Sequence, residues 1–218
     1  MRRDAPASGH PVANEACRAI ANASGVTFAG GRIDALVRCD GLVLSTREPL
    51  ATLFGVAQVR RALRTPSFAL VHVVFAPASH RALLLGLVRL ENLGGEPLAL
   101  EYTEIWDVPA GEYRTAQAAC ERRFGGHVFA LAEASDVTRA RPPEVAPARG
   151  LALDVAVAIP ARARRHLSFA YVAMPEEEDA GELVRAWRGG VAEELERIGG
   201  SGQSVAAYRE LGRYSRPP

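Results

Sequence analysis

The chain has 218 residues, of which 26 are basic and 25 acidic, and every basic residue is an arginine. The formal net charge of +1 gives no overall basic surface of the kind that nucleic-acid-binding proteins carry. The absence of lysine excludes mechanisms that need a Schiff base, a P-loop lysine or a lysine general base. The composition, 48% hydrophobic and 23% charged, is typical of a globular domain, and the length suffices for a core without disulfides.

The three cysteines, Cys17, Cys39 and Cys120, are widely spaced and form no CxxC pair, so we expect reduced thiols and a cytoplasmic protein. The five histidines show no metal-binding spacing, and we expect neither a metal nor another cofactor. The most apolar stretch, residues 68–90, is interrupted by His, Pro and Arg, which indicates buried strands and no membrane span.

Residues 1–27 are rich in Ala, Ser, Pro and Gly. They predict a loose lead-in with a short helix near Glu15–Ala21. From residue 28 to 174, short apolar runs alternate with turn residues, which predicts a mainly β, antiparallel β-sandwich. The predicted strands are Ala35–Arg38, Leu42–Ser45, Ala69–Phe75, Ala82–Asn92, Leu98–Val108, His127–Glu133, Leu151–Ile159 and Arg165–Met174.

The strongest local pattern predicts a β-hairpin. Leu83–Asn92 and Leu98–Val108 are the two arms, and Leu93–Pro97, with its Gly pair, is the turn. Tyr102 and Trp106 lie on the more apolar face of the second arm, which should meet the core or a partner.

The remaining segments lie in the C-terminal half of the chain. The segment Arg114–Arg123 is compatible with a short helix, but its apolar residues are too small to decide its structure. The prolines of Arg139–Arg149 predict an extended loop. An acidic start at residues 175–179 and a Gly pair at the end predict a linker helix over 175–200. A flexible tail is expected over 201–218. The apolar face of that helix comprises Leu183, Trp187, Val191, Leu195 and Ile198.

Glu104 is the candidate for a functional carboxylate, because it lies between Tyr102 and Trp106 on the apolar face of its strand. Such a carboxylate needs a donor, for example an arginine or a backbone N–H. The two aromatic rings predict either a stacking platform for sugar or ordinary core packing. Glu101 and Asp107 point to the opposite face, so a glycosidase carboxylate pair with Glu104 is not expected.

The segment LLLGLVRLENLGGEPLALEYTEIWDVPAGEY resembles the N-terminal β-sandwich of bacterial carbohydrate-active enzymes with an (α/α)6 barrel. These include glycoside phosphorylases, glucoamylase-like enzymes and cyclic glucan synthases. The segment LSFAYVAMPEEEDAGELVRAWRGGVAEELERI resembles the last sandwich strand and the helix that leads to the barrel, so the resemblance covers about residues 65–198. The matching residues of the first segment are Arg89, Glu91, Asn92, Gly94, Glu96, Pro97, Glu104, Trp106 and Asp107.

The resemblance implies a galactose-mutarotase-like supersandwich. The chain departs from the family because it stops soon after the linker helix, so the barrel and its catalytic carboxylates are absent. We therefore expect a fragment, a split subunit or a stand-alone protein without catalytic residues. Its expected partners are a helical catalytic barrel and an oligo- or polysaccharide bound by Tyr102, Glu104 and Trp106.

Two other hypotheses remain open. The first is a small mutarotase-like epimerase, in which Glu104 would act as a base with His72 or His127 as the acid. The second is a protein-interaction module with no sugar role, anchored by the exposed apolar face of the C-terminal helix around Trp187.

Overall fold

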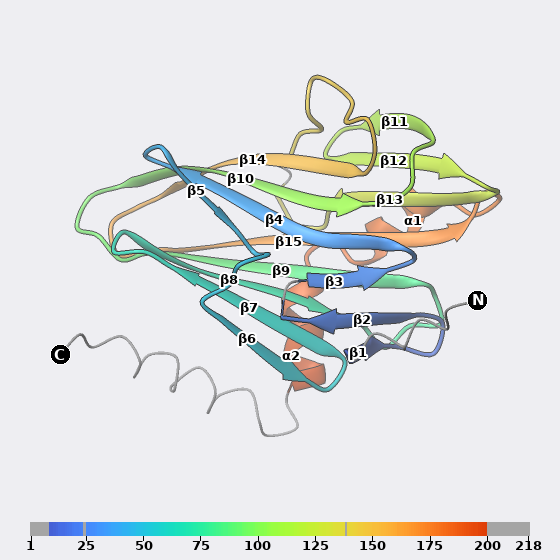
Figure 1. Cartoon of the computed structure of the whole chain (residues 1–218), viewed down its shortest axis with the longest axis horizontal. Coiled ribbons are helices and arrows are strands. Elements are labelled where there is room, and N and C mark those ends of the chain that lie inside the picture. The colour runs from blue at the N-terminus through green and yellow to red at the C-terminus, as the bar shows by residue number, and fades with distance from the viewer. Residues whose placement is uncertain (1–8, 24, 138, 200–218) are drawn as a thin grey trace, which may run out of the picture.

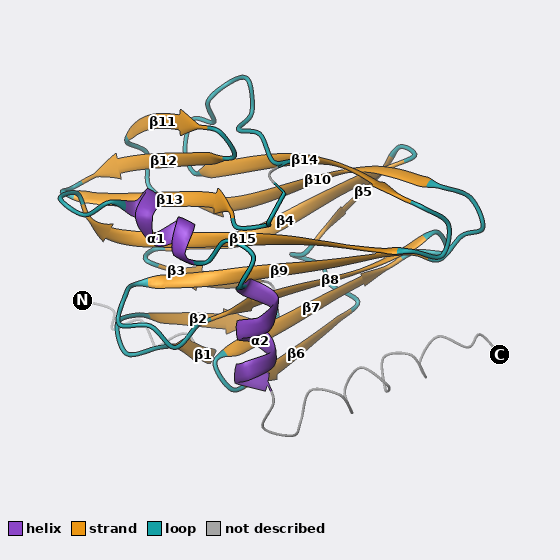
Figure 2. Cartoon of the chain, turned by 180° about the vertical axis from the view of Figure 1, so that it is seen from behind, coloured by secondary structure: helices purple, strands orange, loops and turns teal. Residues whose placement is uncertain are grey.

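The structure is a computed structural model that describes residues 9–23, 25–137 and 139–199. Two antiparallel sheets pack face to face, and two short helices lie on the outer face of one of them (Figures 1 and 2). The predicted mainly β sandwich is therefore confirmed.

The first sheet contains the N-terminal strands and two later ones. Its strands are β1 (His10–Ala13), β2 (Arg18–Asn22), β3 (Gly25–Phe28), β4 (Gly31–Cys39), β5 (Leu42–Ser45), β10 (Leu98–Asp107) and β14 (Leu151–Ile159). Their order is β1-β2-β3-β4-β10-β14, and β5 pairs with β4.

Within the described residues, the second sheet has eight strands, and the two helices lie on its outer face. Its strands are β6 (Ala51–Gly55), β7 (Gln58–Arg64), β8 (Phe68–Phe75), β9 (Leu83–Asn92), β11 (Glu112–Ala116), β12 (Ala119–Phe124), β13 (His127–Glu133) and β15 (Arg164–Pro175). Their order is β11-β12-β13-β15-β9-β8-β7-β6.

The predicted hairpin of Leu83–Val108 is wrong, because its two arms belong to different sheets. β9 pairs with β8 and β15, whereas β10 pairs with β4 and β14. The segment between them is a connection from one sheet to the other. β14 and β15 are joined by a second connection of this kind. Both arms are apolar because both line the interior between the sheets. Two apolar segments separated by turn residues are also the sequence pattern of a hairpin, which is why the two cases were confused.

Two further expectations are corrected. The predicted lead-in contains three strands, β1 to β3, and the helix expected near Glu15–Ala21 is a turn followed by β2. The segment Arg114–Arg123, whose structure the sequence left undecided, belongs to the β11–β12 hairpin and is not a helix. Ala118 has a φ of 56° in its turn. Small and polar residues dominate these segments, so their sequences lack the alternation of apolar and polar residues by which a strand is recognised.

The single C-terminal helix is replaced by two short ones, α1 (Ala180–Ala186) and α2 (Val191–Gly199). Asp179 caps α1 by accepting from the N–H groups of Gly181 and Glu182. Gly189, with a φ of 79°, lies in the turn between the helices. The predicted tail at 201–218 lies outside the described residues.

The predicted apolar helix face packs within the chain. Val191 and Leu195 are buried against the outer face of the second sheet, and Leu183, Trp187 and Ile198 pack on the same cluster. The exposed anchor that the interaction-module hypothesis requires is therefore covered by the chain's own sheet. None of the described helices is long and apolar enough to cross a membrane.

Candidate functional site

The three predicted site residues lie between the two sheets. Tyr102, Glu104 and Trp106 alternate along β10 and point inward, as expected for one face of a strand. Each of the three has 0% exposed surface. This is the placement of core residues, and it leaves no ring face for a saccharide to stack on in this conformation.

Trp106 is the largest fully buried side chain of the core. Its ring stacks on Phe28 with 5.4 Å between centroids, and it meets Phe129 and Tyr171 edge-on. Its indole Nε1 donates to the carbonyl of Phe28 at 3.3 Å. The indole has both an apolar surround and a hydrogen-bond partner, so it meets the requirements of a buried tryptophan.

Glu104 accepts three hydrogen bonds from side chains. Tyr102 donates to Oε2 at 2.5 Å, Tyr171 donates to Oε1 at 2.7 Å, and Nε2 of His72 lies 3.2 Å from Oε1. Tyr171 and His72 come from β15 and β8 of the opposite sheet. The expected donor, an arginine or a backbone N–H, is therefore replaced by two phenols and an imidazole.

The tautomer of His72 follows from its other neighbour. Its Nδ1 lies 2.9 Å from Nη2 of Arg61, and a guanidinium can only donate. Nδ1 therefore accepts, and the ring proton lies on Nε2, from which it is donated to Glu104.

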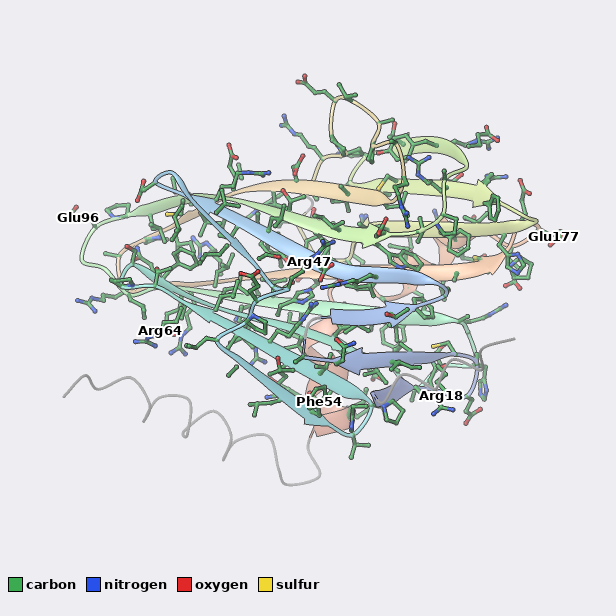
Figure 3. All side chains as sticks on the ribbon, viewed as in Figure 1. Arg18, Arg47, Phe54, Arg64, Glu96 and Glu177 are labelled. Atoms are coloured by element: carbon green, nitrogen blue, oxygen red, sulfur yellow. The ribbon has the colours of Figure 1, made fainter. Side chains whose placement is uncertain are left out.

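Arg61 continues the network to a second carboxylate. This fully buried guanidinium contacts Oδ1 of Asp34 at 3.3 Å and donates to the carbonyls of Ile33 and Thr46. Asp34 is also bound by Arg47, whose Nε lies 2.8 Å away and whose side chain is half exposed. Figure 3 labels Arg47, where the network reaches the surface.

Burial governs the ionisation of the tyrosines and of the arginine. It raises the pKa of Tyr102 and of Tyr171 well above the usual value, and the charge of Glu104 adds to this effect. Burial lowers the pKa of Arg61, against the opposing influence of Asp34 and Glu104. Both phenols therefore remain protonated donors to Glu104 at neutral pH.

The pairing of Glu104 with His72 has the geometry of an acid–base pair. Both residues are fully buried, as are Tyr102 and Tyr171, so a substrate has no access to the pair in this conformation. His127, the other predicted acid, lies exposed at the start of β13, and its Nδ1 contacts the carbonyl of Gly125. The structure thus brings one of the two predicted histidines to Glu104.

Sequence reasoning missed Asp34, Arg61 and Tyr171. Arg61 occupies an inward position of β7, between the buried Val59 and Leu63. A charged residue at an apolar position of a strand is a detectable signal, but β7 itself was not predicted. Among the described residues, no group of three or more His, Cys, Asp or Glu side chains could hold a metal ion.

Comparisons with known proteins give a likeness in fold. No family model matches the sequence. No curated protein matches it either. Among solved structures, a protein named "putative kojibiose phosphorylase from human microbiome" superposes with a TM-score of 0.55 at 8% identity. The match covers 90% of this chain and 33% of that chain, so this chain spans about a third of that protein.

Two further structures have lower similarity. The Slr1438 protein from Synechocystis matches with a TM-score of 0.44 at 10% identity, over 73% of this chain and 92% of that chain. A polysaccharide lyase matches with a TM-score of 0.48 at 12% identity, over 83% of this chain and 35% of that chain.

Proposed function

We propose that the chain is a non-catalytic β-sandwich of a carbohydrate-active system and packs on a helical catalytic barrel. The observation that carries the proposal is the fold likeness to the protein named as a kojibiose phosphorylase. It covers 90% of this chain and only 33% of that one. In that protein a sandwich of this kind is one part of a larger chain. The resemblance of residues 65–198 to barrel-associated sandwiches supports the same assignment.

The absence of catalysis in this chain is supported by the burial of its acid–base pair. Glu104 and His72 contact each other, but neither has exposed surface. Their polar atoms are occupied by Tyr102, Tyr171 and Arg61. These bonds stabilise the interior, and a saccharide would have to replace them.

Any saccharide contact of the domain therefore lies outside the predicted trio of Tyr102, Glu104 and Trp106. These side chains support the wall of the sandwich from within, and the residues that touch a sugar come from its surface.

The first experiment tests catalysis. The purified chain is incubated with kojibiose or maltose, with and without inorganic phosphate, and released glucose and glucose phosphate are measured. We expect no turnover above that of heat-denatured protein. Turnover that survives Glu101→Gln but is lost in Glu104→Gln would contradict the non-catalytic assignment.

The second experiment tests the partner. The reading frames on either side of the gene are co-expressed with the tagged chain, and the purified material is analysed by light scattering and assayed for activity. We expect a stoichiometric complex with a helical-barrel subunit, and phosphorolysis or hydrolysis in the complex alone. Neighbouring frames that encode no such barrel, together with a monomeric chain, would contradict the barrel partner.

The 3.2 Å contact between His72 and Glu104 favours an epimerase as the second candidate function. Polarimetry of freshly dissolved α-D-glucose and α-D-galactose tests it. Mutarotation accelerated by the chain and lost in His72→Gln would establish the epimerase in place of the barrel-packing domain.

A further inference from the structure

Part of the outer face of the second sheet is not covered by the helices. α1 and α2 pack on the end of this face where β9 begins and β15 ends. The other end, where β9 ends and β15 begins, is clear of both helices (Figure 2). Four neighbouring strands form this clear part, in the order β15-β9-β8-β7. Residues that lie opposite each other in a sheet point to the same face, so the strand register identifies the outward side chains.

The register gathers arginines on this clear surface. One row runs across the four strands through Arg64, Ala69, Glu91 and Arg164. The next two rows run through Ala62, Val71, Arg89 and His166, and through Arg60, Val73, Leu87 and Ser168. The three rows thus hold four arginines, and Glu91 is their one acidic residue. We call these outward residues the arginine face.

The arginine face is a local concentration of positive charge in a chain whose formal net charge is only +1. His166 reports this charge, because burial lowers its pKa and the neighbouring Arg89 and Arg164 lower it further. Glu91 offsets one of the four positive charges through an ion pair with Arg164, whose Nη2 lies 3.0 Å from Oε1. Both side chains of this pair are at least partly exposed. Such a pair contributes little to stability, so a carboxylate of a ligand can compete for Arg164.

The spacing of the arginines favours an extended anion. Arg64 and Arg164 are exposed at the two ends of one row. Their Cα atoms lie three interstrand spacings of about 4.8 Å apart, or about 14 Å, which exceeds the length of one sugar ring. A guanidinium binds a carboxylate through two parallel N–H bonds. A chain of linked units that carries several carboxylates can therefore contact both ends of the row at once.

The surface between the arginines is aliphatic. Ala62, Ala69 and Val71 lie there and are all partly exposed. None of the outward positions of the three rows carries a Phe, Tyr or Trp ring, whereas proteins that bind single-stranded nucleic acids stack the bases on such rings. Small aliphatic side chains instead allow the C–H face of a sugar ring to lie flat against the sheet.

We propose that the arginine face binds a polysaccharide that carries carboxylate groups, that is, one with uronic acid residues. Arg64 and Arg164 bind carboxylates at the two ends of the row, and Val71 and the alanines contact the rings between them. The choice of a saccharide among polyanions rests on the proposed carbohydrate function. The proposal assigns a saccharide contact to the outer surface of the second sheet, away from the buried trio on β10.

The test is fluorescence anisotropy of a fluorescein-labelled oligogalacturonate titrated with the full chain. We expect saturable binding that weakens as sodium chloride is added, because salt screens exposed charges. The double substitution Arg64→Gln with Arg164→Gln should weaken binding about tenfold or more, because it removes two charge-assisted contacts. Both side chains are exposed, so the circular dichroism spectrum should stay that of the wild type.

Arg114→Gln with Arg188→Gln is the matched control, because it removes the same charge from exposed arginines on β11 and after α1. Arg114 also resembles Arg164 in having a surface glutamate as its partner, Glu112. The control should bind as the wild type does. Equal weakening by the two double substitutions would overturn the arginine face, because net charge alone would then determine binding.

Two further outcomes would also contradict the proposal. A labelled oligothymidylate or poly-glutamate bound as tightly as the oligogalacturonate would overturn the choice of a saccharide. Absence of oligogalacturonate binding would overturn the arginine face as a saccharide site. It would leave the barrel partner standing, because co-expression with the neighbouring reading frames decides that partner separately.

Discussion

Glu104 is a buried carboxylate whose three donors come from both sheets of the sandwich. Tyr102 lies on its own strand, and His72 and Tyr171 reach it from the opposite sheet. An ion buried in this way is tolerated only where nearly all of its hydrogen-bonding capacity is satisfied. Removing the Glu104 carboxylate leaves its three donors without an acceptor. The resulting loss of stability is therefore larger than the contribution of one hydrogen bond.

The first prediction concerns this acceptor. Glu104→Ala should lower the free energy of unfolding by about 3–5 kcal/mol, because it leaves the buried donors Tyr102, Tyr171 and His72 without their acceptor and creates a cavity. Urea unfolding followed by circular dichroism measures the change. Glu101→Ala is the control, because Glu101 is exposed on β10 three residues before Glu104, and its effect should stay within about 0.5 kcal/mol. Equal effects of the two substitutions would show that the network is not a source of stability.

The second prediction concerns Gly86 of β9. A Cβ at this position would lie 2.8 Å from the hydroxyl of Tyr171 and 3.2 Å from its ring. Gly86→Ala should therefore displace Tyr171 from Glu104 and destabilise the fold by about 1–3 kcal/mol. In a Tyr171→Phe background the alanine should cost less, because the closest atom has been removed. A double-mutant cycle by urea unfolding measures the difference, and strictly additive effects would argue against this role of Gly86.

The need of Glu104 for a donor could be predicted from sequence, but the identity of the donors could not. An inward carboxylate between two aromatic residues demands a partner wherever it lies. Tyr171 is 67 positions away, and the register that brings it to Glu104 depends on how β15 pairs with β9. Asp34 and Arg61 were missed for a related reason, since their burial depends on elements that meet only in the folded chain.

At the scale of elements, Asn92 ties together two of the connections that cross between the sheets, β9–β10 and β14–β15. Its Nδ2 lies 3.1 Å from the carbonyl oxygens of Ile159 and Pro160 and 2.8 Å from that of Glu96, and its two N–H groups are shared among these three acceptors. Its Oδ1 accepts from the N–H of Gly94 at 2.8 Å. The side chain thus fixes the start of the β9–β10 connection against the end of β14.

The third prediction follows from these bonds. Asn92→Ala should lower the free energy of unfolding by about 2–4 kcal/mol, because it leaves several backbone groups at the crossing without partners. Guanidinium unfolding provides the measurement. Glu96→Ala removes an exposed side chain and keeps the backbone carbonyl that Asn92 uses, so it should be close to neutral. A neutral Asn92→Ala would mean that the two connections hold their positions without it.

The residues of this connection also explain why the sequence pattern predicts a hairpin. The Asn-x-Gly turn and the apolar arms were recognised, but a turn that changes sheets and one that reverses a strand share these residues. The strands with strong apolar runs, such as β9 and β14, were located to within a residue. The short strands β1 to β3 and β11 to β12 were missed, because Ala, Arg and Thr leave no clear alternation.

The fourth prediction concerns the docking of α2 and its pH dependence. Glu194 of α2 accepts two hydrogen bonds from Arg197 and one from the N–H of Ala78, in the loop before β9. The bonds from Arg197, followed by the bond from Ala78, lower the pKa of the Glu194 carboxyl below 4.5. A carboxyl with a depressed folded pKa stabilises the fold above its unfolded value, and this contribution is lost as the pH falls through the folded value.

Hydrogen exchange of the amides in Val191–Gly199 should therefore speed up as the pH falls below about 4.5, after correction for intrinsic exchange rates. Glu194→Gln should remove this pH dependence and show faster exchange already at neutral pH. Glu193→Gln is the control, because Glu193 lies exposed on the same turn of α2. A pH dependence that persists in Glu194→Gln would assign the effect to another group.

At the scale of the whole molecule, the two sheets share one interior and should unfold together. Trp106 of the first sheet packs on Phe129 and Tyr171 of the second, and the Glu104 network crosses the same boundary. The chain also passes between the sheets several times, so neither sheet is a continuous segment that could fold alone. The sandwich was predictable from the succession of short strands, but these crossings were not, because they depend on which sheet each strand joins.

The fifth prediction makes this cooperativity measurable with the two tryptophans of the chain. In Trp187→Phe the fluorescence reports on Trp106 alone, which lies between the sheets. In Trp106→Phe it reports on Trp187, which follows α1 and is half-buried against the apolar cluster on the outer face of the second sheet. With Trp106 as the probe, fluorescence and far-ultraviolet circular dichroism should give coincident urea transitions, because loss of its environment requires both sheets to separate. Trp187 should report the same transition or an earlier one, since α1 and α2 cover only the outer face of the second sheet (Figure 2). A Trp106 signal lost well before the circular dichroism would mean that the sheets separate while their strands remain paired.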